Sequence, residues 1–116
     1  MSTSEETTST SPSVEGWVFA DAGAMEWQRL GEGIGMKLLA PANGRVIALF
    51  KFEAGYVGGT HDHEDPEFSY ILEGTMVSNG VLMEAGHAYA AEQGTTHEEF
   101  RTDTGCTLVS VFKSPF

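Results

Sequence analysis

Apolar residues in this chain occur in short segments, and polar or turn-forming residues separate them at regular intervals. Asn43-Gly44 and Asn79-Gly80 each stand between two apolar segments, where Asn-Gly favours a tight hairpin because both residues tolerate positive φ. The strand-like segments read WVFA, KLLA, RVIALFKF, EFSYILE, TMVS, VLMEA, AYAAE, HEEFRT and TLVSVF. About eight to ten short strands at this spacing predict an all-β chain that folds as a sandwich or small barrel.

Helix is expected only locally. The segment DAGAMEWQRLGEG has room for one or two helical turns, but its glycines argue against a longer helix. Residues 1–13 are nearly all Ser, Thr and Glu, which cannot bury enough apolar surface to offset the entropy of ordering. The sequence therefore predicts a disordered tail over residues 1–13 and a single folded domain over residues 14–116.

Charge and cysteine content narrow the expected partners and compartment. The chain has 17 acidic and 6 basic residues, and no cluster of Lys or Arg could neutralise phosphates, so nucleic acid and anionic membranes are not expected partners. The longest apolar run, VIALF, is too short to span a bilayer, and the first residues do not resemble a signal peptide. Cys106 is the single cysteine and is expected to be a small buried residue. A cytoplasmic protein without disulfides is predicted.

Two of the four histidines lie one residue apart, and a glutamate follows closely. In an extended chain His61, His63 and Glu67 share parity, so their side chains are able to point the same way and converge on one cation. The alternative is a pair of loop histidines within a polar patch, HDHEDPE. His87 follows a glycine at a turn and is expected to be solvated.

The wider spacing resembles that of the cupin superfamily. The first cupin motif, G-x5-H-x-H-x3,4-E-x6-G, is matched in full by Gly55, His61, His63, Glu67 and Gly74. The second motif, G-x5-P-x-G-x2-H-x3-N, is matched in part by Gly86, Gly94 and His97, while Glu92 stands in the place of proline and Arg101 in the place of asparagine. The resemblance implies an antiparallel β-barrel of the jelly-roll type.

The same resemblance implies a metal site formed by His61, His63, Glu67 and His97, with one divalent ion per chain. Mixed nitrogen and oxygen ligands suit Fe(II), Mn(II), Ni(II), Zn(II) or Cu(II), and the lack of thiolate ligands argues against a structural zinc site. Four protein ligands at most leave one or two coordination positions open to water or substrate.

Side chains near the expected metal suggest further roles. Glu99 and Arg101 share the parity of His97, so they are expected to face the pocket as a hydrogen-bonding carboxylate and a guanidinium that binds an anion or carbonyl. The alternative is that these two charges pair with each other near the barrel mouth or face solvent. Tyr56 is a candidate acid, base or substrate contact. The candidates to line an apolar cavity are Phe50, Phe52, Tyr56, Phe68, Tyr70, Met83 and Phe100.

A weaker resemblance rests on scattered positions such as Trp27, Gly35 and Lys37. There the chain looks like small cupins similar to acetylacetone and dihydroxyacetophenone dioxygenases, which implies Fe(II) and cleavage of a β-diketone or hydroxyketone with O2. Glu67 departs from that group, whose diketone-cleaving members tend to use three histidines. The alternatives are a redox-neutral cupin isomerase or lyase, with Glu99, Tyr56 or Tyr70 as acid or base, and a non-catalytic metal or small-ligand sensor.

Cupins of this size commonly pair, so a homodimer is expected. Phe68, Tyr70 and Leu72 alternate with the ligand face and are candidates for burial behind the barrel wall or at the dimer contact.

Overall fold

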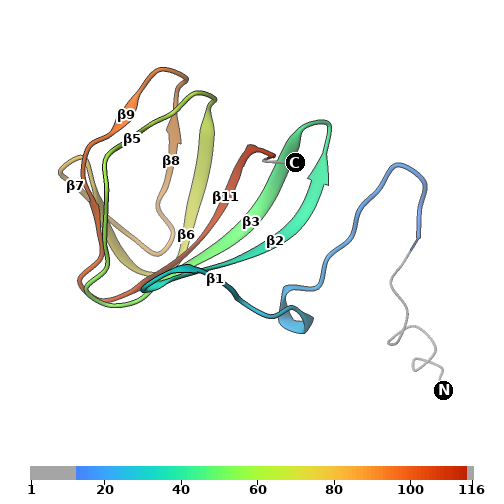
Figure 1. The fold of residues 1–116 in the computed structure, drawn as a ribbon, viewed down its shortest axis with the longest axis horizontal. Coiled ribbons are helices and arrows are strands. Elements are labelled where there is room, and N and C mark those ends of the chain that lie inside the picture. The colour runs from blue at the N-terminus through green and yellow to red at the C-terminus, as the bar shows by residue number, and fades with distance from the viewer. Residues whose placement is uncertain (1–12, 115–116) are drawn as a thin grey trace.

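The computed structural model describes residues 13–114, and within that range β-strands dominate. Figure 1 shows the strands arranged as one curled sheet that closes most of a barrel. The elements in chain order are η1 (Ala22–Ala24), β1 (Gln28–Gly31), β2 (Ile34–Ala42), β3 (Arg45–Phe52), β4 (Val57–Gly58), β5 (His61–Asp62), β6 (Glu67–Ser78), β7 (Val81–Glu84), β8 (Ala88–Ala91), β9 (Thr96–His97), β10 (Phe100–Arg101) and β11 (Cys106–Lys113). The 3-10 turn η1 falls in the segment that has room for one or two helical turns.

The strands follow an antiparallel barrel topology. The main sheet has the order β1-β2-β3-β11-β6-β10-β4, and β5 and β9 form a separate two-stranded ladder. The 12-residue strand β6 bends between two halves, because its first half pairs with β8 and β11 while its second half pairs with β7 and β10. The predicted fold class, an all-β antiparallel barrel of the jelly-roll type, is confirmed.

Both Asn-Gly pairs form the predicted hairpin turns. Asn43 and Gly44 have φ values of 50° and 79° and join β2 to β3, and Asn79 and Gly80 have φ values of 50° and 81° and join β6 to β7. Left-handed backbone at both central positions is the geometry of the tight hairpin turn. Turn chemistry therefore fixes two of the strand pairings that shape the barrel.

Alternation along the strands places the core inside the curled sheet. On β3 and β11, Ala48, Phe52, Cys106 and Leu108 point inward and are buried. Around them pack Ile71, Met76, Met83 and Phe100. Phe68 and Tyr70 were expected among the cavity-lining residues, but they occupy the alternate positions of β6 and lie exposed on the outside of the sheet.

The residues before the 3-10 turn form the N-terminal arm, residues 13–20. It makes a turn at Glu15 and Gly16, where Trp17 N donates to Val14 O at 3.0 Å. Figure 1 shows the arm standing apart from the barrel, beyond β2. The segment WVFA was predicted to be a strand, but Trp17–Ala20 pairs with no strand in the described range. From residue 21 onward the chain is tied to the barrel, since Lys37 Nζ donates to Ala22 O at 2.7 Å and lies 4.6 Å from the centre of the Trp27 ring.

Residues 1–12 lie outside the described range, and so does nearly all of the predicted disordered tail. Between residues 13 and 114, no helix is long and apolar enough to cross a membrane.

Candidate metal centre

A short ladder brings two histidines from distant parts of the sequence together. Strands β5 and β9 pair antiparallel with His61 opposite His97 and Asp62 opposite Thr96. The hydroxyl of Thr96 donates to Asp62 Oδ1 at 2.9 Å, which holds the ladder in register. Because cross-strand neighbours lie close together, the His61 and His97 rings have centroids 5.0 Å apart.

His63 joins the cluster from the bend that follows β5. Its backbone N–H donates to Thr95 O at 2.8 Å, and its carbonyl accepts from Gly94 N at 2.8 Å. Its ring Nδ1 lies 3.2 Å from Thr95 Oγ1. The turn before β9 therefore orients the His63 ring. Side-chain parity predicted one continuous extended chain here, whereas strand β5 ends at Asp62 and the histidines converge through this ladder and turn.

The three histidines can hold one metal ion. Ligand atoms of His61, His63 and His97 all lie within 4.8 Å of one another. His63 Nε2 and His97 Nδ1 are buried and have no hydrogen-bond partner, while His97 Nε2 is hydrogen-bonded to Ser78 Oγ. Buried ring nitrogens without partners are unfavourable, and a divalent cation would satisfy both. The residues present therefore fit a metal ion. Thr95 orients the His63 ring and Ser78 orients the His97 ring.

Burial also favours the form of histidine that binds metal. The pKa of His97 is lowered from its ordinary value, first by burial and then by its proximity to His61. A lowered pKa keeps the imidazole neutral over a wider pH range, and only the neutral ring offers a lone pair to a metal ion.

Glu67 borders the histidine cluster at the start of β6. Its Oε1 lies 3.5 Å from His63 Nε2, and its Oε2 accepts hydrogen bonds from Tyr89 Oη at 2.8 Å and Ser69 Oγ at 3.2 Å. Glu67 is not one of the three residues that lie within mutual ligand distance. Its assignment as a fourth metal ligand remains a prediction.

Tyr89 is a site residue that sequence reasoning missed. It lies on β8 opposite Ser69 of β6 and donates its phenol proton to Glu67. Burial, and then the negative charge of Glu67, raise the pKa of Tyr89, so the phenol stays protonated and remains a donor. In the sequence, only its inward-facing position in the segment AYAAE marks this tyrosine, and it is not part of either cupin motif.

His61 and His97 open onto a cavity of about 280 Å³ inside the barrel. The polar residues of this cavity belong to the histidine cluster or lie on the neighbouring strands β6, β8 and β11. They are His61, Glu67, Tyr89, His97 and Ser110. The other side chains that line it are aromatic or aliphatic: Ile34, Phe50, Phe52, Tyr56, Phe100, Leu108 and Phe112. Among residues 13–114, no lysine or arginine lines this cavity.

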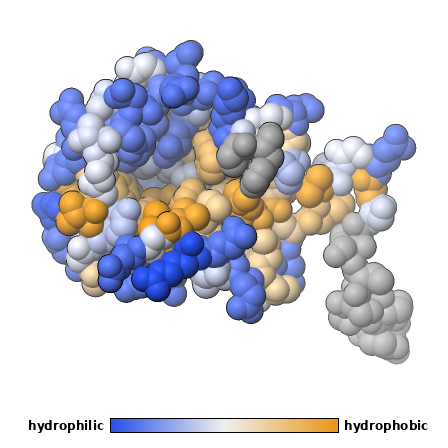
Figure 2. All heavy atoms as spheres, viewed as in Figure 1, coloured by the Kyte–Doolittle hydropathy of each residue, from blue (hydrophilic) through white to orange (hydrophobic). Residues whose placement is uncertain are grey.

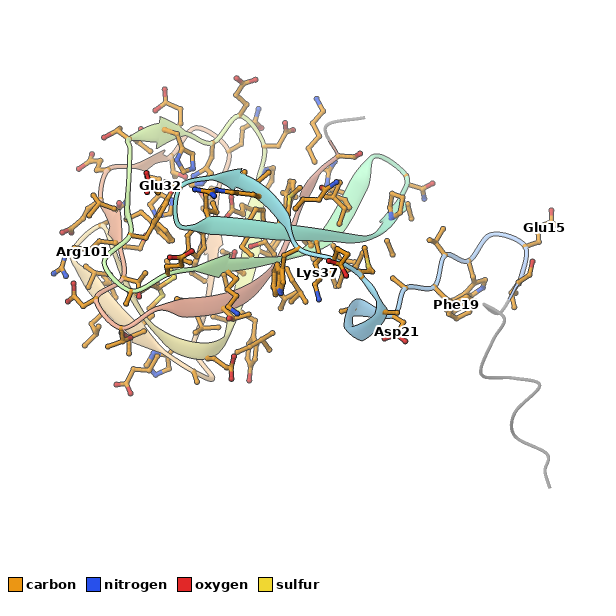
Figure 3. The ribbon with its side chains drawn as sticks, turned by 60° about the horizontal axis from the view of Figure 1, so that its bottom comes forward. Glu15, Phe19, Asp21, Glu32, Lys37 and Arg101 are labelled. Carbon is orange, nitrogen blue, oxygen red and sulfur yellow. The ribbon has the colours of Figure 1, made fainter. Side chains whose placement is uncertain are left out.

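The remaining candidate residues divide between the cavity and the surface. Tyr56 lines the cavity, with its ring 5.0 Å from that of Phe52. Arg101 instead pairs with Asp103 at 2.8 Å and with Glu99 at 3.4 Å, and Glu99 Oε1 accepts from Gly80 N at 2.9 Å. Figure 3 shows Arg101 on the outside of the barrel. This ion-pair network is the alternative that the sequence left open for Glu99 and Arg101, because β9 and β10 are separate strands and parity does not carry between them.

His87 and Cys106 lie where the sequence predicted. His87 is exposed after β7 and its Nδ1 accepts from Glu84 N at 3.0 Å, and it is not part of the group of histidines within mutual ligand distance. Cys106 is buried in the core, and burial raises the pKa of its thiol to about 11, so it is a packing residue.

Replacing Glu67 by glutamine is expected to weaken divalent-metal binding by roughly tenfold to a hundredfold, the scale on which changes to a ligand shell act. The amide keeps the shape but removes the anion beside His63. Competition titration against a chromophoric chelator measures the affinity. Glu64→Gln is the matched control, because it removes the same charge from the exposed loop before β6. An equal loss in both variants would show that Glu67 acts only through long-range charge.

Comparison with known proteins supports this fold. Pectin degradation protein KdgF of Dickeya dadantii (strain 3937) is 25% identical over 91 residues, which cover 74% of this chain and 83% of that protein. The structure of KdgF from Halomonas sp. is 24% identical with a TM-score of 0.74, covering 82% of this chain and 91% of that chain. The structure of an acetylacetone dioxygenase from Acinetobacter johnsonii is 18% identical with a TM-score of 0.73, covering 91% of this chain and 78% of that chain.

The two structural likenesses show a shared fold. The family described as the ChrR cupin-like domain matches residues 15–115, nearly the whole chain. The protein therefore belongs to the ChrR cupin-like domain family, within the cupin superfamily.

Proposed function

We propose that this protein is a metal-dependent enzyme that binds a small neutral ketone, a β-diketone or hydroxyketone, and with iron(II) cleaves it using O2. The observation that carries the proposal is a three-histidine cluster beside a cavity whose other lining residues are mostly aromatic or aliphatic and, among residues 13–114, include no lysine or arginine. The solved acetylacetone dioxygenase with the same fold lends support, since acetylacetone is a β-diketone.

Size and charge favour a small uncharged substrate. A volume of about 280 Å³ lies at the lower end of small-molecule sites. The exposed residues Asp62, Glu64 and Glu98 are sequence neighbours of the three histidines, and Figure 2 shows hydrophilic residues over the wall that holds β5 and β9. The chain as a whole has a formal net charge of −11, so it repels anions. Because pectin is built of acidic sugars, the likeness to KdgF does not extend to a pectin-derived substrate in this proposal.

Each part of the site has a distinct task. His61, His63 and His97 would hold the ion, and iron(II) bound there supplies Lewis acidity and reactivity toward O2. Tyr89 holds the Glu67 carboxylate in place through its phenol proton, which leaves Oε1 on the side of His63. Phe50, Phe52 and Phe100 pack around the carbon skeleton of the ketone and keep water from the reacting carbons.

A second candidate is redox-neutral isomerisation of an enolisable ketone. It is favoured by the hydrogen-bonded pair of Tyr89 and Glu67 in the cavity wall, because a carboxylate beside the histidine cluster is able to take a proton from one carbon and return it to the next. This reaction needs no O2 and works equally well with a redox-inert metal.

Oxygen uptake separates the two candidates. Untagged protein loaded with iron(II) and mixed with acetylacetone is expected to consume O2 equimolar with the diketone, and zinc-loaded protein is expected to consume none. Galacturonate, an acidic sugar, is expected to give no uptake in either form. Conversion of the ketone by the zinc protein without O2 would establish isomerisation instead, while thermal stabilisation by the ketone without turnover would indicate a ligand-binding role.

A further inference from the structure

Three polar side chains form a chain of hydrogen bonds along the wall of the cavity. Ser69 Oγ donates to Glu67 Oε2 at 3.2 Å and lies 2.6 Å from Ser110 Oγ. The two serines stand opposite each other on β6 and β11, which are neighbours in the sheet (Figure 1). Both are buried, Ser110 is only 2% exposed, and Ser110 lines the cavity. The Ser110 hydroxyl therefore ends, at the ligand space, a chain that begins at Glu67.

The carboxylate of Glu67 sets the direction of the hydrogen bonds in this chain. An ionised carboxylate only accepts, so Ser69 gives its single hydroxyl proton to Glu67. The Ser69 oxygen then meets Ser110 as an acceptor, and Ser110 gives its own proton to Ser69. The reverse direction would take the Ser69 proton away from an anion and give it to a neutral hydroxyl, which forms the weaker bond.

The Ser110 hydroxyl is left with lone pairs only. Between residues 13 and 114 its oxygen has no hydrogen bond besides the one with Ser69. Tyr89 is in the same condition, because its phenol proton also goes to Glu67. Tyr56 lines the cavity too, but its partly exposed phenol can turn to donate or to accept and so imposes no direction. The two hydroxyls tied to Glu67 thus present acceptors to a ligand and have no proton to give.

We propose that Ser110 selects a ligand that donates a hydroxyl hydrogen bond, so that the substrate class of this cavity is a hydroxyketone rather than a β-diketone. The inference rests on the proposed function for the ketone group, while the preference for a hydroxyl follows from Ser110 and its partners alone. A hydroxyketone brings a proton to the Ser110 lone pairs. A β-diketone in its keto form brings only acceptors, which leaves both oxygens unpaired.

The surroundings of Ser110 make this contact selective. Leu108 and Phe112 flank it on the inward side of β11, and Ala48 stands opposite it on β3. These apolar side chains offer no other partner to a polar ligand atom placed beside Ser110. A site built to pair with a hydroxyl discriminates against the analogue that lacks it, because the polar group of the protein is then left without a partner.

Three matched ligands measure the preference on zinc-loaded protein, in which no O2 is consumed. At the carbon across the ring from the ketone, 4-hydroxycyclohexanone donates and accepts, 4-methoxycyclohexanone only accepts, and 4-methylcyclohexanone does neither. Isothermal titration is expected to show the hydroxy compound binding roughly tenfold more tightly than the other two, the effect of one hydrogen bond. Ser110→Ala is expected to lose most of that ratio. Equal affinities in the wild type, or a ratio that survives Ser110→Ala, would overturn the proposal.

Ser69→Ala tests the direction of the chain rather than its polarity. The substitution removes the acceptor of the Ser110 proton and frees that proton for the cavity, although Ser110 itself stays in place. The difference between the hydroxy and methoxy compounds is therefore expected to disappear. The control, Thr107→Ala, removes a hydroxyl from an alternate position of β11 and should keep the wild-type ratio. A wild-type ratio in correctly folded Ser69→Ala, checked by circular dichroism, would contradict the assigned direction.

Failure of the ketone function would give a different result. If none of the three ketones binds the zinc-loaded protein, the proposed function fails, and cyclohexanol and methoxycyclohexane are then titrated into metal-free protein. A preference for cyclohexanol that Ser110→Ala abolishes would uphold the role of Ser110 without the ketone. No preference between the alcohol and the ether would overturn it.

Discussion

Replacing His63 by alanine is expected to abolish stoichiometric binding of divalent metal. The ring is buried, its Nδ1 lies 3.2 Å from Thr95 Oγ1, and its Nε2 has no hydrogen-bond partner, which leaves that nitrogen available to a metal ion. The substitution removes a neutral nitrogen ligand and leaves no side chain that could replace it. Elemental analysis of dialysed protein measures the effect, and His61→Ala and His97→Ala should give the same result.

His87→Ala is the matched control for this series. It removes a histidine that lies in an exposed turn and bonds to the backbone N–H of Glu84. The variant should keep its full complement of metal. If His61→Ala retained metal while His87→Ala lost it, the assignment of the metal centre would be wrong, and the function argued from it would fail with it.

Gly74→Ala is expected to lower the free energy of unfolding by about 3 kcal/mol. Gly74 is the last residue of the first cupin motif and has a φ of 79°. A Cβ at this position would lie 1.9 Å from Gly105 O, which is a backbone atom and cannot rotate away. The pairing of β6 with β11 at Gly74 and Cys106 would have to separate to relieve the clash.

Gly44→Ala isolates the contribution of the clash. Gly44 has the same φ of 79°, but a Cβ there would meet no atom within 4 Å. The backbone conformation alone should therefore cost about 1 kcal/mol. Urea denaturation of the metal-free variants measures both values. Equal losses in the two variants would contradict a role for the close approach of Gly74 to Gly105.

Much of the fold could be predicted from turn chemistry and glycine spacing. Asn43-Gly44 and Asn79-Gly80 specify hairpins through their own backbone preferences, so no knowledge of tertiary structure was needed. The segment WVFA has strand composition but forms the N-terminal arm, because strand propensity does not supply a partner strand. Whether an apolar extended segment is a strand or an arm depends on contacts that sequence pattern alone does not encode.

The candidate site was predictable to the extent that motif spacing encodes it. His61, His63 and His97 were found from spacing, and the structure brings them together. Tyr89 was missed because its role depends on the register between β6 and β8, which places it opposite Ser69. The expectation for Arg101 rested on parity with His97, and the break between β9 and β10 removes the basis for that argument.

The metal content of untagged wild-type protein tests the central claim most directly. Elemental analysis of protein purified without a histidine tag or added metal is expected to give about one iron ion per chain, bound by the three-histidine cluster. Protein free of divalent metal, and unable to take it up on reconstitution, would contradict the metal centre itself. Zinc at full occupancy would leave the centre in place and contradict the oxygen-dependent function.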